Sequence, residues 1–198
     1  MDSTRPVPSA GSWYRRLSSA QYSQRETHSD ERPPGSGKST LANEIARDLG
    51  IPVIDKDAIR DVLPDDVGGR SYEAMLALAQ RQLRIGLSVV ADSPLGYGRA
   101  YRAAINLAAA EGAGVAVIEC HCSNVAAWRE RVEARQGTGL PDHHTTNWAS
   151  VAAFGRRTKA DPFDLDVPHL RIDTAASMRT VLAQALRWLK QLDAESPS

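Results

Sequence analysis

The feature that most constrains this chain of 198 residues is a glycine-rich segment, Pro34-Gly35-Ser36-Gly37-Lys38-Ser39-Thr40. Gly35 and Gly37 let the backbone curl so that successive N–H groups point at phosphate oxygens. Lys38 is placed to reach the β- and γ-phosphates of a nucleotide, and the Ser39 hydroxyl is placed to bind Mg²⁺. A Gly/Ser linker that contains a lysine is the alternative. Apolar Leu41, Ile45 and Leu49 follow at helical spacing, so the sequence favours a phosphate-binding loop at the start of a helix.

The residues before this loop depart from the full motif. The motif begins with a glycine at the position that Arg32 occupies here. The strand before such a loop is central in a parallel sheet and is therefore nearly all apolar, whereas residues 13–33 contain no run of three aliphatic residues. We therefore expect the first strand to be absent or degraded, with residues 18–32 as a poor substitute at best. We also expect an irregular segment before Pro33 and an imperfectly supported loop.

Composition argues against several classes of function. The 24 basic and 24 acidic side chains give a formal net charge of zero, which provides no general attraction to membranes or nucleic acids. Cys120 and Cys122 are the only cysteines, which are too few for a zinc site and favour structural thiols in a reducing compartment. No apolar run approaches the ~20 residues of a membrane span. We therefore expect a cytoplasmic protein without a membrane or nucleic-acid partner.

The first 32 residues are expected to form a disordered or atypical N-terminal segment. Between Thr4 and Arg25 they contain no acidic residue, which is weakly typical of an organelle transit peptide. Asp2, Glu26 and Asp30 argue against that alternative, and we prefer a disordered tail or an altered N-terminus.

From Ser39 onward, signals for helices and strands alternate, which predicts an α/β fold with a parallel sheet covered by helices on both faces. Apolar runs predict strands at residues 52–54, 87–91, 115–120 and 169–173. Helical spacing and stop signals predict helices at residues 39–49, 57–62, 72–85, 99–111, 124–135, 148–159 and 177–192, with Ser123 as N-cap of the fifth. These elements define one domain at residues 33–193, followed by a frayed tail at 194–198.

Acidic residues follow three of the predicted strands. Ligands bind at the carboxyl ends of strands in parallel α/β sheets, so we expect Asp55, Asp57 and Asp92 to lie near the phosphate loop. Asp55 or Asp57 is a candidate base for the phosphate acceptor, and Asp92 is a candidate to support Mg²⁺ through a bound water. Alternatively, Asp57 caps the helix that follows and Asp55 lies at the surface. Glu119, at the end of the next strand, is interpreted as structural.

The fifth predicted helix carries two arginines on one face. Arg131 and Arg135 are four residues apart, and they are candidates to close over nucleotide phosphates and stabilise charge in the transition state. The alternative is a solvated helix face in which the arginines pair with Glu130 and Glu133. The Gly/Pro/His segment that follows, residues 136–146, has the composition of a lid.

Together these residues resemble the small P-loop kinases of the AAA-domain "predicted kinase" type, a group related to zeta-toxin-like, chloramphenicol phosphotransferase-like, gluconate and shikimate kinases. The resemblance covers residues 33–192 and lacks the first strand and the first Walker A glycine. It is carried by residues 34–40, 55–60 and 89–94, and by Arg131 with Arg135. It implies a three-layer, P-loop NTPase-like fold with a five-stranded core, Mg·ATP as phosphate donor, and a small acceptor that bears a hydroxyl. In this family the aspartate after the second strand handles the acceptor, which corresponds to Asp55 or Asp57.

The expected function is therefore transfer of the γ-phosphate of Mg·ATP to a hydroxyl of a small molecule, with Lys38, Arg131 and Arg135 stabilising charge. Two alternatives stay open. In the first, water is the acceptor and the protein is an NTPase. In the second, the damaged first strand has abolished nucleotide binding and the chain is an inactive variant of a kinase.

Overall fold

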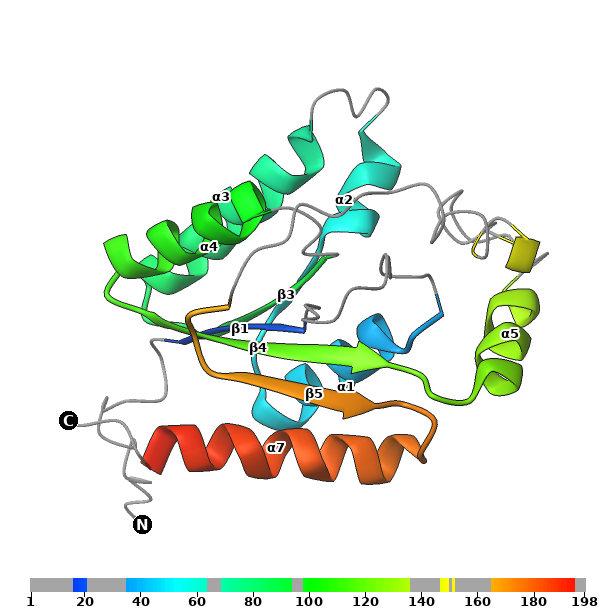
Figure 1. The fold of residues 1–198 in the computed structure, drawn as a ribbon. Coiled ribbons are helices and arrows are strands. Elements are labelled where there is room, and N and C mark those ends of the chain that lie inside the picture. The colour runs from blue at the N-terminus through cyan, green and yellow to red at the C-terminus, as the bar shows by residue number, and fades with distance from the viewer. Residues whose placement is uncertain are drawn as a thin grey trace, which may run out of the picture.

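A central parallel sheet organises the chain (Figure 1). The computed structural model describes residues 16–20, 35–63, 69–93, 98–135, 147–149, 151 and 165–194. Its strands pair in parallel in the order β2-β3-β1-β4-β5, and they are β1 (Arg16–Ala20), β2 (Val53–Asp55), β3 (Val89–Asp92), β4 (Gly114–His121) and β5 (His169–Asp173). The expected α/β fold with a five-stranded core is confirmed.

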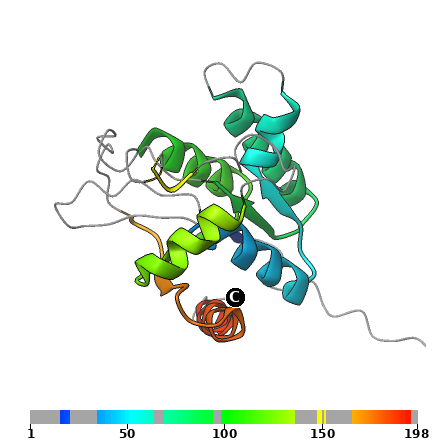
Figure 2. The ribbon, with the colours of Figure 1, turned by 90° about the vertical axis from the view of Figure 1, so that its right-hand side faces the viewer.

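Helices cover both faces of this sheet. On one face lie α1 (Lys38–Leu49) and α7 (Met178–Ala194), and on the other lie α3 (Arg70–Arg84) and α4 (Gly98–Ala110) (Figure 1). The short α2 (Lys56–Val62) follows β2 and packs on α3. Figure 2 looks onto the side of the molecule where α5 (Val125–Ala134) lies, after the carboxyl end of β4. Among the described residues, no helix has both the length and the apolar character needed to cross a membrane.

The predicted helices and strands agree with these bounds to within two residues at most ends. The N-cap of α5 is an exception, because Asn124 and not Ser123 caps the helix by accepting the Ala127 N–H at 3.0 Å. Ser123 instead donates its hydroxyl to Asp173. Of the helix predicted at residues 148–159, the described residues 148, 149 and 151 are helical. The predicted lid at 136–146 and all of the predicted tail after Ala194 lie outside the described residues.

The first strand is present, and it is central. β1 has the sequence RLSSA and pairs with β4 over five residues and with β3 over two. The expectation of an irregular segment before Pro33 is therefore wrong for Arg16–Ala20, while residues 21–34 lie outside the described part. From the sequence, the first strand is expected to be absent or degraded. The structure supports the second alternative, because the strand is present but its sequence is partly polar. Backbone pairing to two neighbours places it in the sheet without the apolar run that usually marks a central strand.

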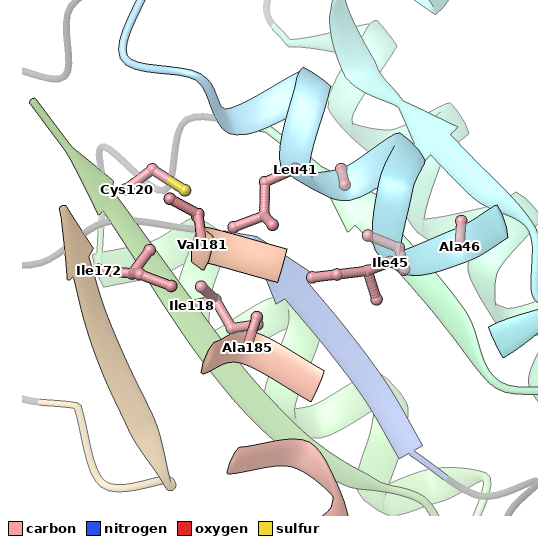
Figure 3. Packing of buried hydrophobic residues seen from close by; sticks show 10 residues of the cluster. Leu41, Ile45, Ala46, Ile118, Cys120, Ile172, Val181 and Ala185 are labelled. Carbon is pink, nitrogen blue, oxygen red and sulfur yellow. The ribbon is translucent and has the colours of Figure 1, made fainter. Parts of the chain in front are cut away.

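Two apolar clusters hold the helices on the sheet. Alternate residues of β3 face opposite sides, so Val90 packs with α1 and α7 while Val89 and Ala91 pack with α3 and α4. Figure 3 shows the first cluster, in which side chains of α1, β4, β5 and α7 converge: Leu41, Ile45, Ala46, Ile118, Cys120, Ile172, Val181 and Ala185. Burial raises the pKa of Cys120 to about 12, which agrees with the expectation that this thiol is structural.

A proline in β1 tests whether this strand has its central place. Proline has no N–H to donate, so Ser18→Pro would remove the one hydrogen bond that the Ser18 N–H can make to a neighbouring strand. Each buried backbone group left unpaired costs about 1–3 kcal/mol, against a total stability of about 5–15 kcal/mol. We expect Ser18→Pro to unfold at clearly lower urea concentration than Ser18→Ala, which keeps the backbone donor. Equal midpoints for the two variants would contradict the central position of β1.

Candidate functional site

The phosphate-loop candidate lies at the N-terminal end of α1. Gly35 and Gly37 have φ angles of 86° and 88°, values in the left-handed region that favours glycine. The Gly37 carbonyl accepts the Leu41 N–H at 3.0 Å and so begins the helix. Because glycine has no side chain that could cap the helix, the N–H groups of the first turn of α1 suit an anion. Pro34, the first residue of the predicted loop, lies outside the described residues.

Both glycines are also closely packed. A Cβ atom on Gly35 would lie 2.6 Å from Val132 Cγ2 and 3.3 Å from Trp128 Nε1, both on α5. A Cβ atom on Gly37 would lie 3.2 Å from the Cβ of Thr174, which follows β5. The loop is therefore held between α5 and the end of β5. Trp128 also meets Trp148 edge-on, with ring centroids 4.9 Å apart.

Lys38, Ser39 and Asp92 form a charged group at the base of the loop. The Lys38 Nζ donates to Ser36 Oγ at 3.1 Å, and burial lowers the pKa of Lys38, an effect that the nearby negative charge of Asp92 partly offsets. Asp92 ends β3 and is only 3% exposed. Burial raises the pKa of Asp92 to about 6, although a hydrogen bond from Ser39 and the charge of Lys38 act in the opposite direction. Thr40, the last residue of the predicted loop, is exposed.

This group has the chemistry of a magnesium site. The Ser39 hydroxyl and the Asp92 carboxylate are oxygen donors, and Mg²⁺ is usually held by one or two carboxylates together with substrate phosphates and waters. Within the described part of the chain, no cluster of three or more His, Cys, Asp or Glu side chains could hold a metal alone. Two oxygen donors would leave the other coordination positions of such an ion to waters and substrate phosphates.

Asp55 and Asp57 flank the start of α2 with different partners. Asp55 is the N-cap, and its Oδ1 accepts the N–H groups of Asp57 at 2.7 Å and Ala58 at 3.2 Å. The alternative that Asp57 is the cap is therefore wrong. Asp57 instead pairs with Lys56 at 2.9 Å and with Arg60 at 3.6 Å. Asp55 lies opposite Asp92 in the β2–β3 register, so the structure brings the predicted carboxylates to one edge of the sheet.

The two arginines of α5 lie in different surroundings. Arg131 donates to the backbone oxygen of Thr174 at 2.7 Å and to its Oγ1 at 3.3 Å. Burial and the neighbouring Arg131 lower the pKa of Arg135, whereas Asp92 raises it. The charge of Arg135 also acts on Lys38, so this arginine lies within electrostatic reach of the loop.

The alternative, in which Arg131 pairs with Glu130 and Glu133 on a solvated face of helix α5, is not what the described contacts of Arg131 show, since they go to Thr174. The ion pair of that helix with Glu133 is made by Arg129, at 2.8 Å. Glu119 is buried and pairs with Arg171 on β5 at 3.2 Å. A pair of this kind between neighbouring strands supports the interpretation of Glu119 as structural.

Sequence reasoning missed Thr174 and Trp128. Neither belongs to a motif, and both reach the loop only through folding. Asp173, next to Thr174, orders the same corner by accepting hydrogen bonds from Ser123 N and Ala175 N at 3.0 and 2.9 Å. Partial burial raises the pKa of Asp173, but these bonds and the Ser123 hydroxyl outweigh it and hold the value at about 2.

Comparison with known proteins finds a family match and distant relatives. Residues 33–160 match the family model described as AAA domain. An uncharacterized protein of Mycobacterium tuberculosis is 32% identical over 171 residues, which cover 77% of this chain and 32% of that protein. The chain thus spans about a third, 32%, of the length of the curated relatives it matches.

Two solved kinases share the fold. A gluconokinase from Sinorhizobium meliloti gives a TM-score of 0.53 at 20% identity and covers 92% of this chain and 95% of that chain. The APS kinase of Mycobacterium tuberculosis, solved in complex with AMPPNP and APS, gives 0.59 at 21% identity over 89% of this chain and 98% of that chain. At these identities the likeness shows the fold alone.

Alanine at Gly35 tests the packing of the loop against α5. Gly50 is the matched control, because its φ is also positive, at 65°, but a Cβ there would meet nothing within 4 Å. Left-handed backbone costs a non-glycine residue roughly 1–2 kcal/mol, so we expect Gly50→Ala to lose about this much. Gly35→Ala should lose more, since Val132 must also move. Equal losses in urea unfolding would show that α5 does not pack on the loop.

Proposed function

This chain belongs to the AAA domain family and has the fold of P-loop kinases, and we propose that it is an ATP-dependent phosphotransferase. It transfers the γ-phosphate of Mg·ATP to a hydroxyl of a small molecule. The proposal rests mainly on one observation: Lys38 and Ser39 both interact with the buried Asp92 at the base of a glycine loop. The catalytic domain comprises residues 33–193 together with β1.

The loop of residues 34–40 binds the phosphates of the nucleotide. Its backbone N–H groups and the N-terminal end of α1 face the anion, and Lys38 adds a positive charge. The lowered pKa of Lys38 has burial as its main cause. A bound phosphate would supply the negative charge that a buried ammonium group requires.

Ser39 and Asp92 hold Mg²⁺ when the nucleotide is bound. Bound there, the ion would supply positive charge to the phosphate oxygens of the nucleotide. Asp92 is already oriented by the hydrogen bond from Ser39, so this pair meets the metal with little rearrangement.

Asp57 orients the acceptor hydroxyl and takes its proton. Both Asp55 and Asp57 act electrostatically on Asp92, but only Asp57 is among the groups that act on Lys38. The Asp57 side chain is 33% exposed and hence accessible to an acceptor. Asp55 uses Oδ1 to cap α2, and its contribution is to place Asp57 at the first turn.

Arg131 and Arg135 stabilise the charge that develops on the transferred phosphoryl group. Arg135, at the C-cap of α5, lies within electrostatic reach of Lys38 and Asp92. Arg131, on the same helix, donates to Thr174 beside the loop. These positions support the proposed role. Fixed positive groups of this kind stabilise a transition state without having to reorganise during the reaction.

Thermal unfolding with Mg·ATP tests the proposal directly. At about 100 times its dissociation constant, a ligand adds about 2.7 kcal/mol to stability, so we expect a clear rise in the melting temperature. Lys38→Ala should lose most of this rise because it removes a phosphate contact. Arg129→Ala is the control, since it removes a cation from an exposed ion pair on α5 and should keep the rise. A wild-type melt that does not move would favour the inactive variant, and phosphate release without an acceptor would favour an NTPase.

Substitution of the two aspartates tests the acceptor side. In Asp57→Asn the carboxylate is lost, and we expect acceptor-dependent ADP formation to fall by about 10²–10⁴-fold. Asp55→Asn is the matched change, because asparagine caps helices as well as aspartate does. In Asp55→Asn the rate of acceptor-dependent ADP formation should fall much less, and both variants should keep the rise in melting temperature with Mg·ATP. A larger loss in Asp55→Asn, measured over a panel of sugars and other small alcohols, would reverse the assignment.

A further inference from the structure

Thr174 lies where three parts of the candidate site meet. It follows β5 directly and is 1% exposed. Its hydroxyl donates to the carbonyl oxygen of Ser36 at 2.8 Å or to that of His121 at 2.9 Å. It also accepts a hydrogen bond from Arg131 Nη1 at 3.3 Å. One buried side chain thus joins the phosphate loop, the end of β4 and the arginine helix.

The single hydroxyl proton has a preferred acceptor. The His121 carbonyl oxygen already accepts the Thr174 backbone N–H at 2.7 Å, so its need for a hydrogen bond is met without the hydroxyl. The proton is therefore available to the Ser36 carbonyl, which lies at the shorter distance and in the more buried contact. A buried carbonyl group that loses such a partner is destabilised.

This bond determines which way the peptide between Ser36 and Gly37 faces. Among the described residues no peptide bond is cis, and in a trans peptide the C=O and N–H groups point in opposite directions. Because the Ser36 carbonyl points at Thr174, the Gly37 N–H points away from β5, where it can donate to an anion held by the loop. Glycines on both sides of Ser36, at 35 and 37, make this peptide easy to turn without such a restraint.

The same residue restrains Arg131. The guanidinium group donates to the Thr174 backbone oxygen at 2.7 Å as well as to the hydroxyl. Because two of its N–H donors bind the same residue, the plane of the Arg131 guanidinium is fixed. A planar guanidinium in a fixed orientation is what makes arginine suitable for binding phosphate.

We propose that Thr174 is a positioning residue, whose hydroxyl sets the direction of the Gly37 N–H and the plane of Arg131 for phosphate binding. This inference rests on the proposed nucleotide site and assigns it a further residue. Gly37 packs closely on Thr174, with 3.2 Å between a Cβ built on Gly37 and the Thr174 Cγ2, so the two residues are matched in shape as well as in hydrogen bonding.

Thr174→Val and Thr174→Ser separate the hydroxyl from the rest of the side chain. Valine keeps the shape and the backbone oxygen but has no hydroxyl, whereas serine keeps the hydroxyl. We expect Thr174→Val to weaken binding of Mg·ATP about tenfold or more, measured by titration calorimetry at a temperature where each variant is fully folded. Thr174→Ser should bind within about threefold of wild type. Val181→Ala, which leaves a cavity under α7, should lower the melting temperature without changing the affinity.

A second measurement, made without ligand, distinguishes failure of the nucleotide-binding proposal from failure of the Thr174 proposal. In ¹H–¹⁵N spectra of the free protein, we expect Thr174→Val to shift or broaden the amide signals of Gly35 and Gly37, and we expect Thr174→Ser to restore them. If the wild type does not bind Mg·ATP but these signals respond in this way, the nucleotide proposal fails and the positioning of the loop by Thr174 stands. If Thr174→Val leaves both the loop signals and the affinity unchanged, the role of Thr174 is overturned.

Discussion

The rest of the structure depends on the pairing of β1 between β3 and β4. Without it, the strand order β2-β3-β1-β4-β5 would separate into two pairs, β2 with β3 and β4 with β5. Asp55 and Asp92 end strands of the first pair, and Thr174 follows a strand of the second. The candidate site draws on both pairs, so its geometry depends on a strand with the partly polar sequence RLSSA. The apolar cluster around α1, which includes Val90 of β3 and Ile118 of β4, supports the same junction.

The charged groups around the loop depend on one another for their electrostatic stabilisation. Burial raises the pKa of Asp92 and lowers that of Lys38, and each group partly offsets the effect of burial on the other. Arg135 adds a second positive charge within reach of both. Lys38 and Arg135 thus place two cations beside a glycine loop whose backbone donors suit an anion.

The sequence predicted the parts of the fold whose signals are local. Apolar runs located β2 to β5, and helical spacing located the helices, because each pattern is complete within its own segment. β1 could not be predicted in this way, since its place comes from backbone pairing with strands that lie about 70 to 100 residues further along the chain. Asn124 replaces Ser123 as N-cap for the same reason, because Asp173 on a distant strand binds Ser123.

The residues of the candidate site likewise fall into those that local sequence could predict and those that it could not. Lys38, Ser39 and the strand-end aspartates could be named from motif and topology, and the structure places them together. Their roles stay predictions. Thr174 could not be named, because its contact with Ser36 joins residues 138 positions apart and nothing near it in the sequence marks it. The distinction between Asp55 and Asp57 likewise required the observed cap.

Hydrogen exchange of the β1 amides tests the central claim most directly. In the free protein, the amides of residues 17–20 should exchange far more slowly than those of an unfolded chain, because β1 pairs on both sides. Saturating Mg·ADP should slow them further, since the proposed nucleotide site spans the junction that β1 holds together. Exchange at unfolded rates while β3 and β4 stay protected would contradict the account, because the phosphate loop would then stand without its central strand.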